Sequence, residues 1–332
     1  MKKTERPYLF CLGLAGAGIM ILILSLCIGS VPVPPGKVLS VLAGTCEETY
    51  INNIILYTRI PRVCAGMIAG AGLSGAGVVI QSVLSNPLAS PHILGVNAGA
   101  GFAVALVLAI FPLSIRFAPA AAFAGALTAV MIVLLISEKA KASKTSLVLA
   151  GVAIECIFSA ATEAVLLFKS DALAGYTDFR IGGFSGVAMS KLVIPGIAIP
   201  VIILGLILAS HHLDVMMLGS DTAKSLGIPV KKARVIFLGC AALLAGLTVS
   251  FAGVLGFVGL LVPHLMRKIV GERSRPLLLS SAIGGAVLLS VCDLLARTLF
   301  TPFEIPVGII MSVIGGPFFI FLVFRRKKRK YD

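Results

Sequence analysis

The sequence is dominated by long apolar stretches that are separated by short polar segments. A helix needs roughly 20 apolar residues to cross the hydrocarbon core of a bilayer, and nine stretches approach or reach that length. They run over residues 9–29, 63–83, 92–111, 119–136, 147–168, 192–210, 235–251, 277–296 and 307–324, and a shorter tenth runs over residues 253–266. Within lipid, a single segment satisfies its backbone hydrogen bonds only as a helix. The sequence therefore predicts an all-α polytopic membrane protein, with one transmembrane domain over residues 1–332.

The overall composition agrees with a membrane location. Hydrophobic residues make up 58% of the chain and charged residues only 13%, a balance that the surface of a soluble domain would not tolerate. The formal net charge is +14, but most basic residues lie at the ends of apolar stretches, where membrane orientation and anionic lipid account for them. We therefore expect membrane lipid, and not nucleic acid, to be the partner of these residues.

The distribution of Lys and Arg decides how many times the chain crosses the membrane. Residues 235–266 form one apolar region that fits either an overlong helix or a span followed by a return. With ten spans and a cytoplasmic N-terminus, 20 of the 28 Lys and Arg residues lie on the cytoplasmic side, whereas merging the two segments leaves only 11 there. Cytoplasmic loops carry an excess of these residues. Ten spans with both termini in the cytoplasm are therefore predicted, with Gly253 and Gly256 in the turn.

Motifs for catalysis and for metal binding are absent from the sequence. The only Gly-Lys pair, Gly36 and Lys37, is followed by Val38, so the chain lacks the phosphate-binding motif G-x-x-x-x-G-K-[ST]. None of the seven cysteines forms a pair with the spacing of a metal site or a redox site. We therefore expect no enzyme activity, no metal site and no cofactor bound by this chain.

Ionisable side chains occur inside two of the apolar stretches, where charges are costly and commonly functional. Glu155, Ser159 and Glu163 recur every four residues, which places them on one face of the fifth stretch. That face is expected to line a pathway or to face the helix bundle. Asp293 and Arg297 are also four residues apart, in the ninth stretch, and can form an ion pair.

A polar segment, residues 211–234, lies between the sixth and seventh stretches on the predicted cytoplasmic side. Its part GSDTAKSLGIPVKKAR, residues 219–234, is typical of a short soluble helix followed by a turn and a basic patch. A bundle of many helices with such a loop and no ATP-binding motif indicates a transport subunit that is driven by a partner. The alternative is a self-sufficient secondary transporter, in which Glu155 and Glu163 would form a proton relay.

Several motifs resemble those of the FecCD/BtuC-type permeases, the membrane subunits of ABC importers for ferric siderophores, haem and cobalamin. The resemblance begins with RIPRVCAGMIAGAGLSGAGVVIQSVLSNPLASPHILGVNAGAG, residues 59–101, and continues through GGFSG, GSDTAKSLGIPVKKAR, GFVGLLVPHLMRKIVG and CDLLART. It covers nearly all of the chain after Arg59. The resemblance implies the type II ABC importer permease fold, in a bacterial cytoplasmic (inner) membrane.

The resemblance also implies partners. The permease would form a homodimer, or a heterodimer with a related permease, with two ABC ATPase subunits on the cytoplasmic face and an extracytoplasmic substrate-binding protein outside. ATP and Mg would be used by the ATPase subunits. A ferric siderophore is the first choice of substrate, followed by haem and then by cobalamin.

In this family the loop between the sixth and seventh spans seats in a groove of the ATPase, so residues 211–234 are expected to form a coupling loop. Asp221 lies in the first turn of the predicted helix, where the helix dipole favours negative charge. Ala223 and Leu226 would offer a small apolar face to the ATPase, and Gly227 would end the helix. The expected coupling residues are Gly219, Asp221, Ala223, Leu226 and Gly227.

The resemblance assigns roles at both membrane surfaces. Outer arginines of the second and ninth spans would accept acidic side chains of the binding protein, because guanidinium groups suit carboxylates. These arginines are Arg59, Arg62 and Arg297. Arg297 would be occupied instead if it paired with Asp293. The cytoplasmic gate would lie after the second span and at the start of the fifth, at Asn86, Leu88, Thr145 and Ser146.

Two features depart from the family pattern. The segment DFRIGGFSG carries Phe179 and Arg180 where the family often has a Trp before its pair of glycines. Glu155 and Glu163 stand where small or apolar residues are expected. We therefore expect Arg180, together with Glu155, Ser159 and Glu163, to line the substrate pathway and to tune passage.

Overall fold

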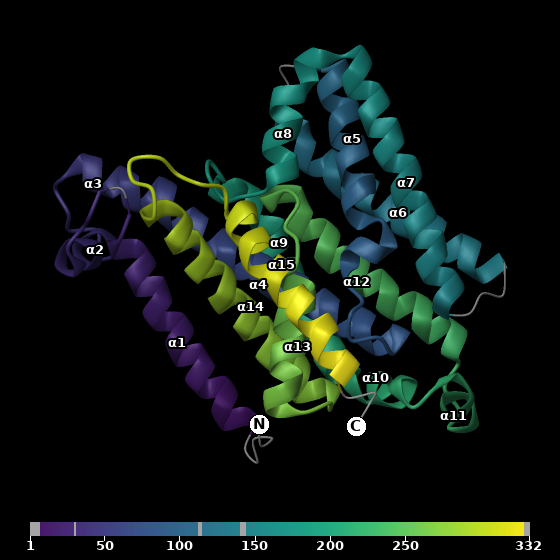
Figure 1. Cartoon of the computed structure of the whole chain (residues 1–332). Helices are drawn as coiled ribbons and strands as arrows, with labels where there is room; N and C mark the ends of the chain where they lie inside the picture. The colour runs from purple at the N-terminus through teal and green to yellow at the C-terminus, as the bar shows by residue number, and fades with distance from the viewer. Residues whose placement is uncertain (1–6, 30, 112–114, 140–143, 329–332) are drawn as a thin grey trace.

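The computed structural model describes residues 7–29, 31–111, 115–139 and 144–328, and these residues fold into helices joined by turns, with no β-strand among them (Figure 1). The α-helices are α1 (Pro7–Cys27), α2 (Pro35–Leu42), α3 (Thr49–Asn53), α4 (Ile60–Leu84), α5 (Val96–Ile110), α6 (Ala118–Lys139), α7 (Lys144–Phe168), α8 (Leu173–Ile181), α9 (Met189–Leu208), α10 (Ser210–Met217), α11 (Ser220–Ser225), α12 (Val230–Ala252), α13 (Val258–Val270), α14 (Ser274–Thr298) and α15 (Val307–Lys328). A π-helical segment, η1 (Ile54–Arg59), joins α3 to α4, and short 3₁₀ helices are η2 (Pro91–Leu94), η3 (Ile115–Phe117) and η4 (Ser170–Ala172).

Each predicted span overlaps one of these helices. Seven of the described helices are long and apolar enough to cross a membrane, while Val96–Ile110 and Val307–Leu322 are shorter apolar helices. The third span begins later than expected, because η2 precedes it and Gly95 interrupts the helix with a φ of +73°. The apolar region 235–266 breaks at Gly253, whose φ of +68° is open to glycine. The helix after the break, α13, begins only at Val258.

Helix α4 is the centre of the bundle and packs against α14, α12, α13 and α9. Its glycines bring backbones into direct contact. A Cβ at Gly70 would lie 2.0 Å from Gly285 O on α14, and one at Gly77 would lie 1.8 Å from Gly259 O on α13. Small residues that allow such close approach are the usual packing device in lipid, where dispersion replaces the hydrophobic drive between helices.

Three non-helical turns satisfy one another in the outer half of the bundle. Val254 N donates to Phe179 O over 3.0 Å, and Gly183 N donates to Ala252 O over 2.8 Å, which joins the end of α8 to the turn between α12 and α13. Gly308 N, at the start of α15, donates to Gly182 O over 3.2 Å. Irregular backbone at membrane depth is tolerated only where other protein groups satisfy it, and these turns therefore depend on each other.

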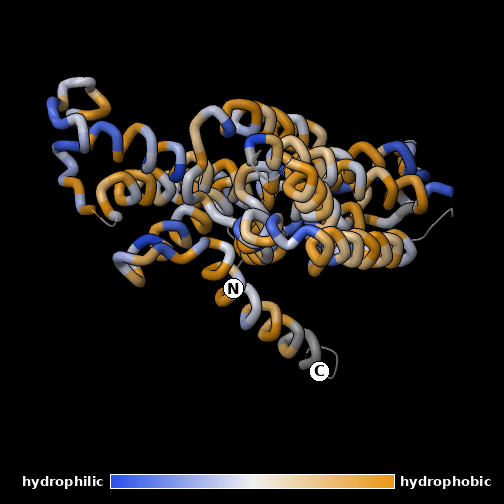
Figure 2. The backbone as a smooth tube through the Cα atoms, turned by 90° about the horizontal axis from the view of Figure 1, so that it is seen from above, coloured by the Kyte–Doolittle hydropathy of each residue, from blue (hydrophilic) through white to orange (hydrophobic). Residues whose placement is uncertain are grey.

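The two ends of the molecule differ in what they carry. The first residues of α1 and the end of α15 lie at the same end as α10 and α11, whereas α2, α3 and α8 lie at the opposite end (Figure 1). Hydrophobic residues dominate the helices, and hydrophilic residues gather in connecting segments (Figure 2). This arrangement agrees with a cytoplasmic end at α10 and α11 and an outer end at α8.

Candidate functional site

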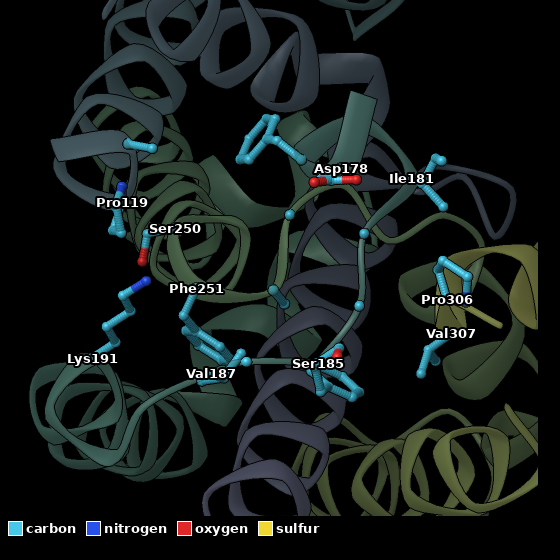
Figure 3. Close-up of a pocket in the computed structure, with 18 of the residues that line it drawn as sticks. Pro119, Asp178, Ile181, Ser185, Val187, Lys191, Ser250, Phe251, Pro306 and Val307 are labelled. Atoms are coloured by element: carbon cyan, nitrogen blue, oxygen red, sulfur yellow. The ribbon is translucent and has the colours of Figure 1, made fainter. Parts of the chain in front are cut away.

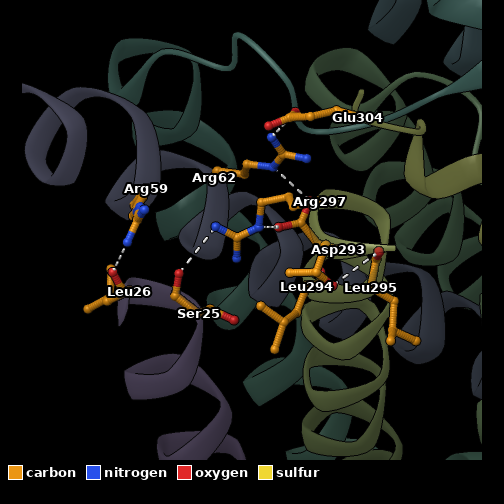
Figure 4. Close-up of polar contacts among 10 residues, drawn as sticks. Ser25, Leu26, Arg59, Arg62, Asp293, Leu294, Leu295, Arg297 and Glu304 are labelled. Carbon is orange, nitrogen blue, oxygen red and sulfur yellow. Dashed lines mark hydrogen bonds and ion pairs between the residues drawn. The ribbon is translucent and has the colours of Figure 1, made fainter. Parts of the chain in front are cut away.

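A cluster of buried charges lies at the outer end of the bundle (Figure 4). Arg62, near the start of α4, donates from Nε to Asp293 Oδ1 over 2.8 Å and from Nη1 to Glu304 Oε2 over 2.6 Å. Arg297 Nε lies 3.3 Å from Asp293 Oδ2, so two arginines share one carboxylate. Buried charges are costly unless they are paired, and the cluster meets this requirement through α4, α14 and the segment before α15.

Arg59 is occupied by the end of α1 and the segment that follows it. Its Nη1 donates to Leu26 O over 2.5 Å and to Cys27 O over 3.0 Å, and its Nη2 donates to Val31 O. The last carbonyls of a helix lack partners within the helix and carry partial negative charge, which favours a cation there. Arg59 therefore caps the C-terminal end of α1 and binds the segment that follows this helix.

The structure brings the three predicted docking arginines together but leaves them little exposed. Arg59, Arg62 and Arg297 line one cavity of about 190 Å³, together with Glu304. Each arginine is only 4–5% exposed and has partners within its own chain. The pairing of Arg297 with Asp293, considered as an alternative from the sequence, is present. The Nη2 atom of Arg297 is buried and has no hydrogen-bond partner within the described residues.

A larger outer cavity of about 480 Å³ lies beside this cluster, between α5, α6, α8, α9, α12 and the start of α15 (Figure 3). Its polar lining includes Asp178, Lys191, Ser250 and Glu304. Sequence reasoning identified neither this cavity nor Glu304. The walls come from many separate segments, among them α4 through Arg62. The one signal for Glu304 was a single acidic residue just before the last span.

The three residues of the predicted polar stripe on α7, Glu155, Ser159 and Glu163, lie in two different environments. Ser159 and Glu163 are exposed, and Glu163 acts electrostatically on Tyr176 of α8, as does Arg180. Burial raises the pKa of the Tyr176 phenol, Arg180 lowers it and Glu163 raises it further. Arg180 and Glu163 therefore both lie within electrostatic range of Tyr176. Glu155 lies deeper, and its Oε1 is 3.0 Å from His92 Nε2.

The predicted gate residues lie on two segments that pack together. After α4, Ser85 takes a φ of +50°, and Asn86 N donates to Gln81 O over 3.0 Å, which closes the helix end. The Asn86 side chain then accepts a hydrogen bond from Leu88 N over 3.1 Å. Thr145 and Ser146 are exposed on the first turn of α7. The loop that contains Asn86 ends in η2, and η2 packs against α7, the helix that begins with Thr145 and Ser146.

The predicted coupling loop folds as two short helices, α10 and α11. Gly219 and Gly227 have φ values of +110° and +83°, a region that favours glycine, and they bound α11 on either side. Gly227 N donates to Lys224 O and Ile228 N to Ala223 O, the paired bonds of a Schellman motif. The two glycines therefore set the direction of α11.

One expectation for this loop is wrong. Ala223 does not offer its side chain to a partner, because it is fully buried within the loop against Val215, Val230 and Ile228. Leu226 is 60% exposed and is the apolar side chain that the loop presents. The charged side chains of Asp221 and Lys224 on α11 are also exposed, with Lys224 Nζ 3.5 Å from Asp221 Oδ1.

Metal-ligating side chains do not cluster in the part of the chain that the structure describes, where no three His, Cys, Asp or Glu residues come together.

Comparison with known proteins relates the chain to membrane transport. A model of the FecCD transport family matches residues 17–325. The Fe(3+)-citrate import system permease protein YfmE of Bacillus subtilis (strain 168) is 36% identical over 333 residues, with 99% of this chain and 98% of that protein covered. The hemin transport system permease protein HmuU of Yersinia pestis is 35% identical over 325 residues, with 94% and 96% covered.

A solved structure agrees with these relatives. It shows a metal-chelate type ABC transporter in an inward-facing conformation, and it matches with a TM-score of 0.85 and 28% identity over 95% of this chain and 99% of that chain. The predicted fold class, an all-helical polytopic membrane protein with the fold of an ABC importer permease, is confirmed.

The matches also decide the class of the protein. A permease is the membrane subunit of an ABC transporter and works with separate ATPase subunits and a binding protein, so this chain is a multi-pass protein of the bacterial cytoplasmic membrane and not an enzyme. The matches to ABC transporter permeases exclude the alternative of a self-sufficient proton-coupled transporter. The chain belongs to the FecCD transport family and is an ABC transporter permease subunit.

Proposed function

We propose that this permease imports a ferric siderophore, with haem as the second choice of substrate and cobalamin as the third. The observation that carries the proposal is the end-to-end similarity to permeases named for iron-containing cargo. YfmE is named for Fe(3+)-citrate, and HmuU for hemin. The Fe(3+) dicitrate transport system permease protein FecD of Escherichia coli (strain K12) is a further such relative, 36% identical over 320 residues.

The substrate pathway lies along α7, where two copies of the permease meet. Ser159 and Glu163 are exposed on a helix that can cross a membrane, and an ionisable side chain facing lipid is costly. A second copy of the chain, or a related permease, would cover this face and enclose a water-filled path. Glu155, Arg180 and the exposed part of the stripe would then contact the substrate.

The binding protein docks over the outer cavity that contains Arg59, Arg62 and Arg297. The three arginines face two acidic side chains, Asp293 and Glu304, so the cluster keeps one excess positive charge. A carboxylate of the binding protein would balance this charge and offer an acceptor to the unpaired Nη2 of Arg297. Because the arginines are buried, docking would require the rim of the cavity to open.

The ATPase subunits act on the coupling loop at the cytoplasmic end. Exposed Leu226 is the apolar contact, and the exposed side chains of Asp221 and Lys224 on α11 are the charged ones. ATP and Mg are used by these subunits, and their closure would push on α10 and α11. The gate at Asn86, Leu88, Thr145 and Ser146 would then open or close the cytoplasmic end of the pathway.

Uptake into vesicles tests the proposed substrate. Vesicles would contain this permease with its ATPase and its binding protein, and they would receive labelled ferric siderophore, haem or cobalamin in the presence of ATP or of a non-hydrolysable analogue. We expect ferric siderophore to accumulate only with ATP. Accumulation of haem or cobalamin alone would correct the substrate, and uptake that is indifferent to ATP would overturn the proposal.

A further inference from the structure

The loop that follows α4 folds back and packs on the first half of α7. A Cβ at Gly151 would lie 1.8 Å from Ile93 O, so the backbone of η2 touches the helix directly. Leu94 and Leu147 are fully buried beside this contact. The loop therefore has a fixed seat on α7, one that only a residue without a side chain at position 151 permits.

A contact between two polar side chains joins the same two segments. His92 Nε2 lies 3.0 Å from Glu155 Oε1, with 59% of the His92 side chain and 25% of the Glu155 side chain exposed. Gly151 and Glu155 are four residues apart and share a face of α7. His92 and Ile93 are neighbours in the loop. They contact Glu155 and Gly151, which lie one turn apart on the same face of α7.

The pair explains why a glutamate is tolerated inside a span. A carboxylate there is costly without a partner, and His92 supplies a donor whether the imidazole is neutral or protonated. A hydrogen bond to a charged group is stronger than a neutral one. Glu155 is therefore held by the loop, and only the exposed quarter of its side chain is left to face the proposed pathway.

The loop also has defined ends at which it can pivot. Ser85 and Gly95 both take left-handed backbone conformations, with φ values of +50° and +73°, and they bracket the segment. Changes of backbone direction at a few residues that end helices are the usual hinges of switching elements. The segment between them carries Asn86 and Leu88.

We propose that His92 and Glu155 are positioning residues for the cytoplasmic gate, and that the contact between them holds the loop of residues 85–95 on α7 in one state of the gate. The inference rests on the proposed function, because the gate residues Asn86 and Leu88 lie in this loop. The gate loop leaves α7 when the pair opens. Without the pair, ATP is hydrolysed without ordered movement of substrate.

Two measurements test the pair. The first is the number of ATP molecules that reconstituted transporter hydrolyses for each substrate molecule imported. The second is the rate of backbone hydrogen exchange of residues 85–95 in the purified permease. The variants are Glu155→Gln, His92→Gln and the swap that combines His92→Glu with Glu155→His. Glu138→Gln is the matched control, because Glu138 is an exposed glutamate at the end of α6 and has no part in the proposed pathway, gate or docking cavity.

Each single variant is expected to raise both quantities by roughly tenfold, the factor for one hydrogen bond to a charged group. The swap is expected to restore both quantities toward the wild type, and Glu138→Gln to leave them unchanged. Wild-type values in both single variants would overturn the inference. So would a swap variant that is as defective as the single variants when compared at equal amounts of assembled transporter.

The exchange measurement separates this inference from the proposed function. If the wild type imports none of the tested substrates while exchange of residues 85–95 still rises and recovers as described, the proposed substrate fails and the pair still holds the loop. If the single variants import substrate normally and the exchange of residues 85–95 does not change in them, the pair has no positioning role.

Discussion

Asp214 Oδ1 accepts a hydrogen bond from the backbone N–H of Ser274 over 2.7 Å, which joins α10 of the coupling loop to the first turn of α14. The first N–H groups of a helix have no partner within the helix, and a side-chain oxygen satisfies them. At its other end, α14 carries Asp293 and Arg297 of the outer cluster. One helix therefore contacts both the coupling loop and the proposed docking cavity.

Replacing Asp214 is expected to weaken communication between the two ends. Asp214→Ala removes the acceptor and should lower the free energy of unfolding by about 1 kcal/mol, the usual contribution of a helix cap. Hydrolysis of ATP by the assembled transporter should respond less to the binding protein. Asp214→Asn keeps an acceptor oxygen and should retain most of the response. An unchanged response in Asp214→Ala would show that this bond is not part of the coupling route.

Asp293→Ala should be among the most destabilising single substitutions in the outer cluster. Asp293 is buried and is the shared partner of Arg62 and Arg297, and removing one partner from a buried ion pair costs about 3–5 kcal/mol. The thermal unfolding temperature of the permease in detergent would measure the loss. Glu304→Gln is the control, since the Glu304 side chain is 35% exposed and its loss should cost much less. Equal effects of the two substitutions would contradict the assignment of Asp293 as the centre of the cluster.

Gly70→Ala should destabilise the bundle because the added methyl group has no room. Its Cβ would lie 2.0 Å from Gly285 O, so α4 and α14 would have to separate, and overpacking of this kind costs about 1–3 kcal/mol. The measurement is again the unfolding temperature in detergent. Gly16→Ala on α1 is the control, because no atom lies within 4 Å of the added Cβ. A Gly70→Ala protein as stable as Gly16→Ala would mean that the two helices tolerate separation.

The helical membrane architecture was predictable because it depends on the length of the apolar stretches, which local sequence reveals. The late start of the third span was not, since it depends on Gly95 and on the seat of η2 against α7. Sequence also could not distinguish an exposed arginine from a buried one. Arg59 is covered because carbonyls of Leu26 and Cys27 reach it from α1, more than thirty residues away in the chain.

The coupling loop shows the same limit at the scale of a single helix turn. Ala223 and Leu226 are both apolar and three residues apart, so their spacing predicts one shared face. In the structure Ala223 points into the loop, where Val215 and Val230 cover it, while Leu226 points outward. Which side of α11 faces inward is decided by the Schellman turn at Gly227 and by packing on α10, and neither is visible in the spacing.

Because one residue is exposed and the other is buried, substitutions at Leu226 and Ala223 should lower uptake for different reasons. Leu226→Asp changes an exposed side chain, so the permease should fold and assemble normally, but the charge should weaken the contact with the ATPase. ATP-driven uptake should fall by roughly fivefold or more, as for the loss of an interface residue worth over about 1 kcal/mol.

Ala223→Arg places a large charged group in the buried interior of the loop and should instead lower the stability of the loop. Its loss of uptake should come with a loss of protection of residues 211–230 from hydrogen exchange, whereas Leu226→Asp should keep that protection. The amount of ATPase that copurifies with each variant completes the comparison. Normal copurification and normal uptake in Leu226→Asp would show that the ATPase does not contact this side of α11.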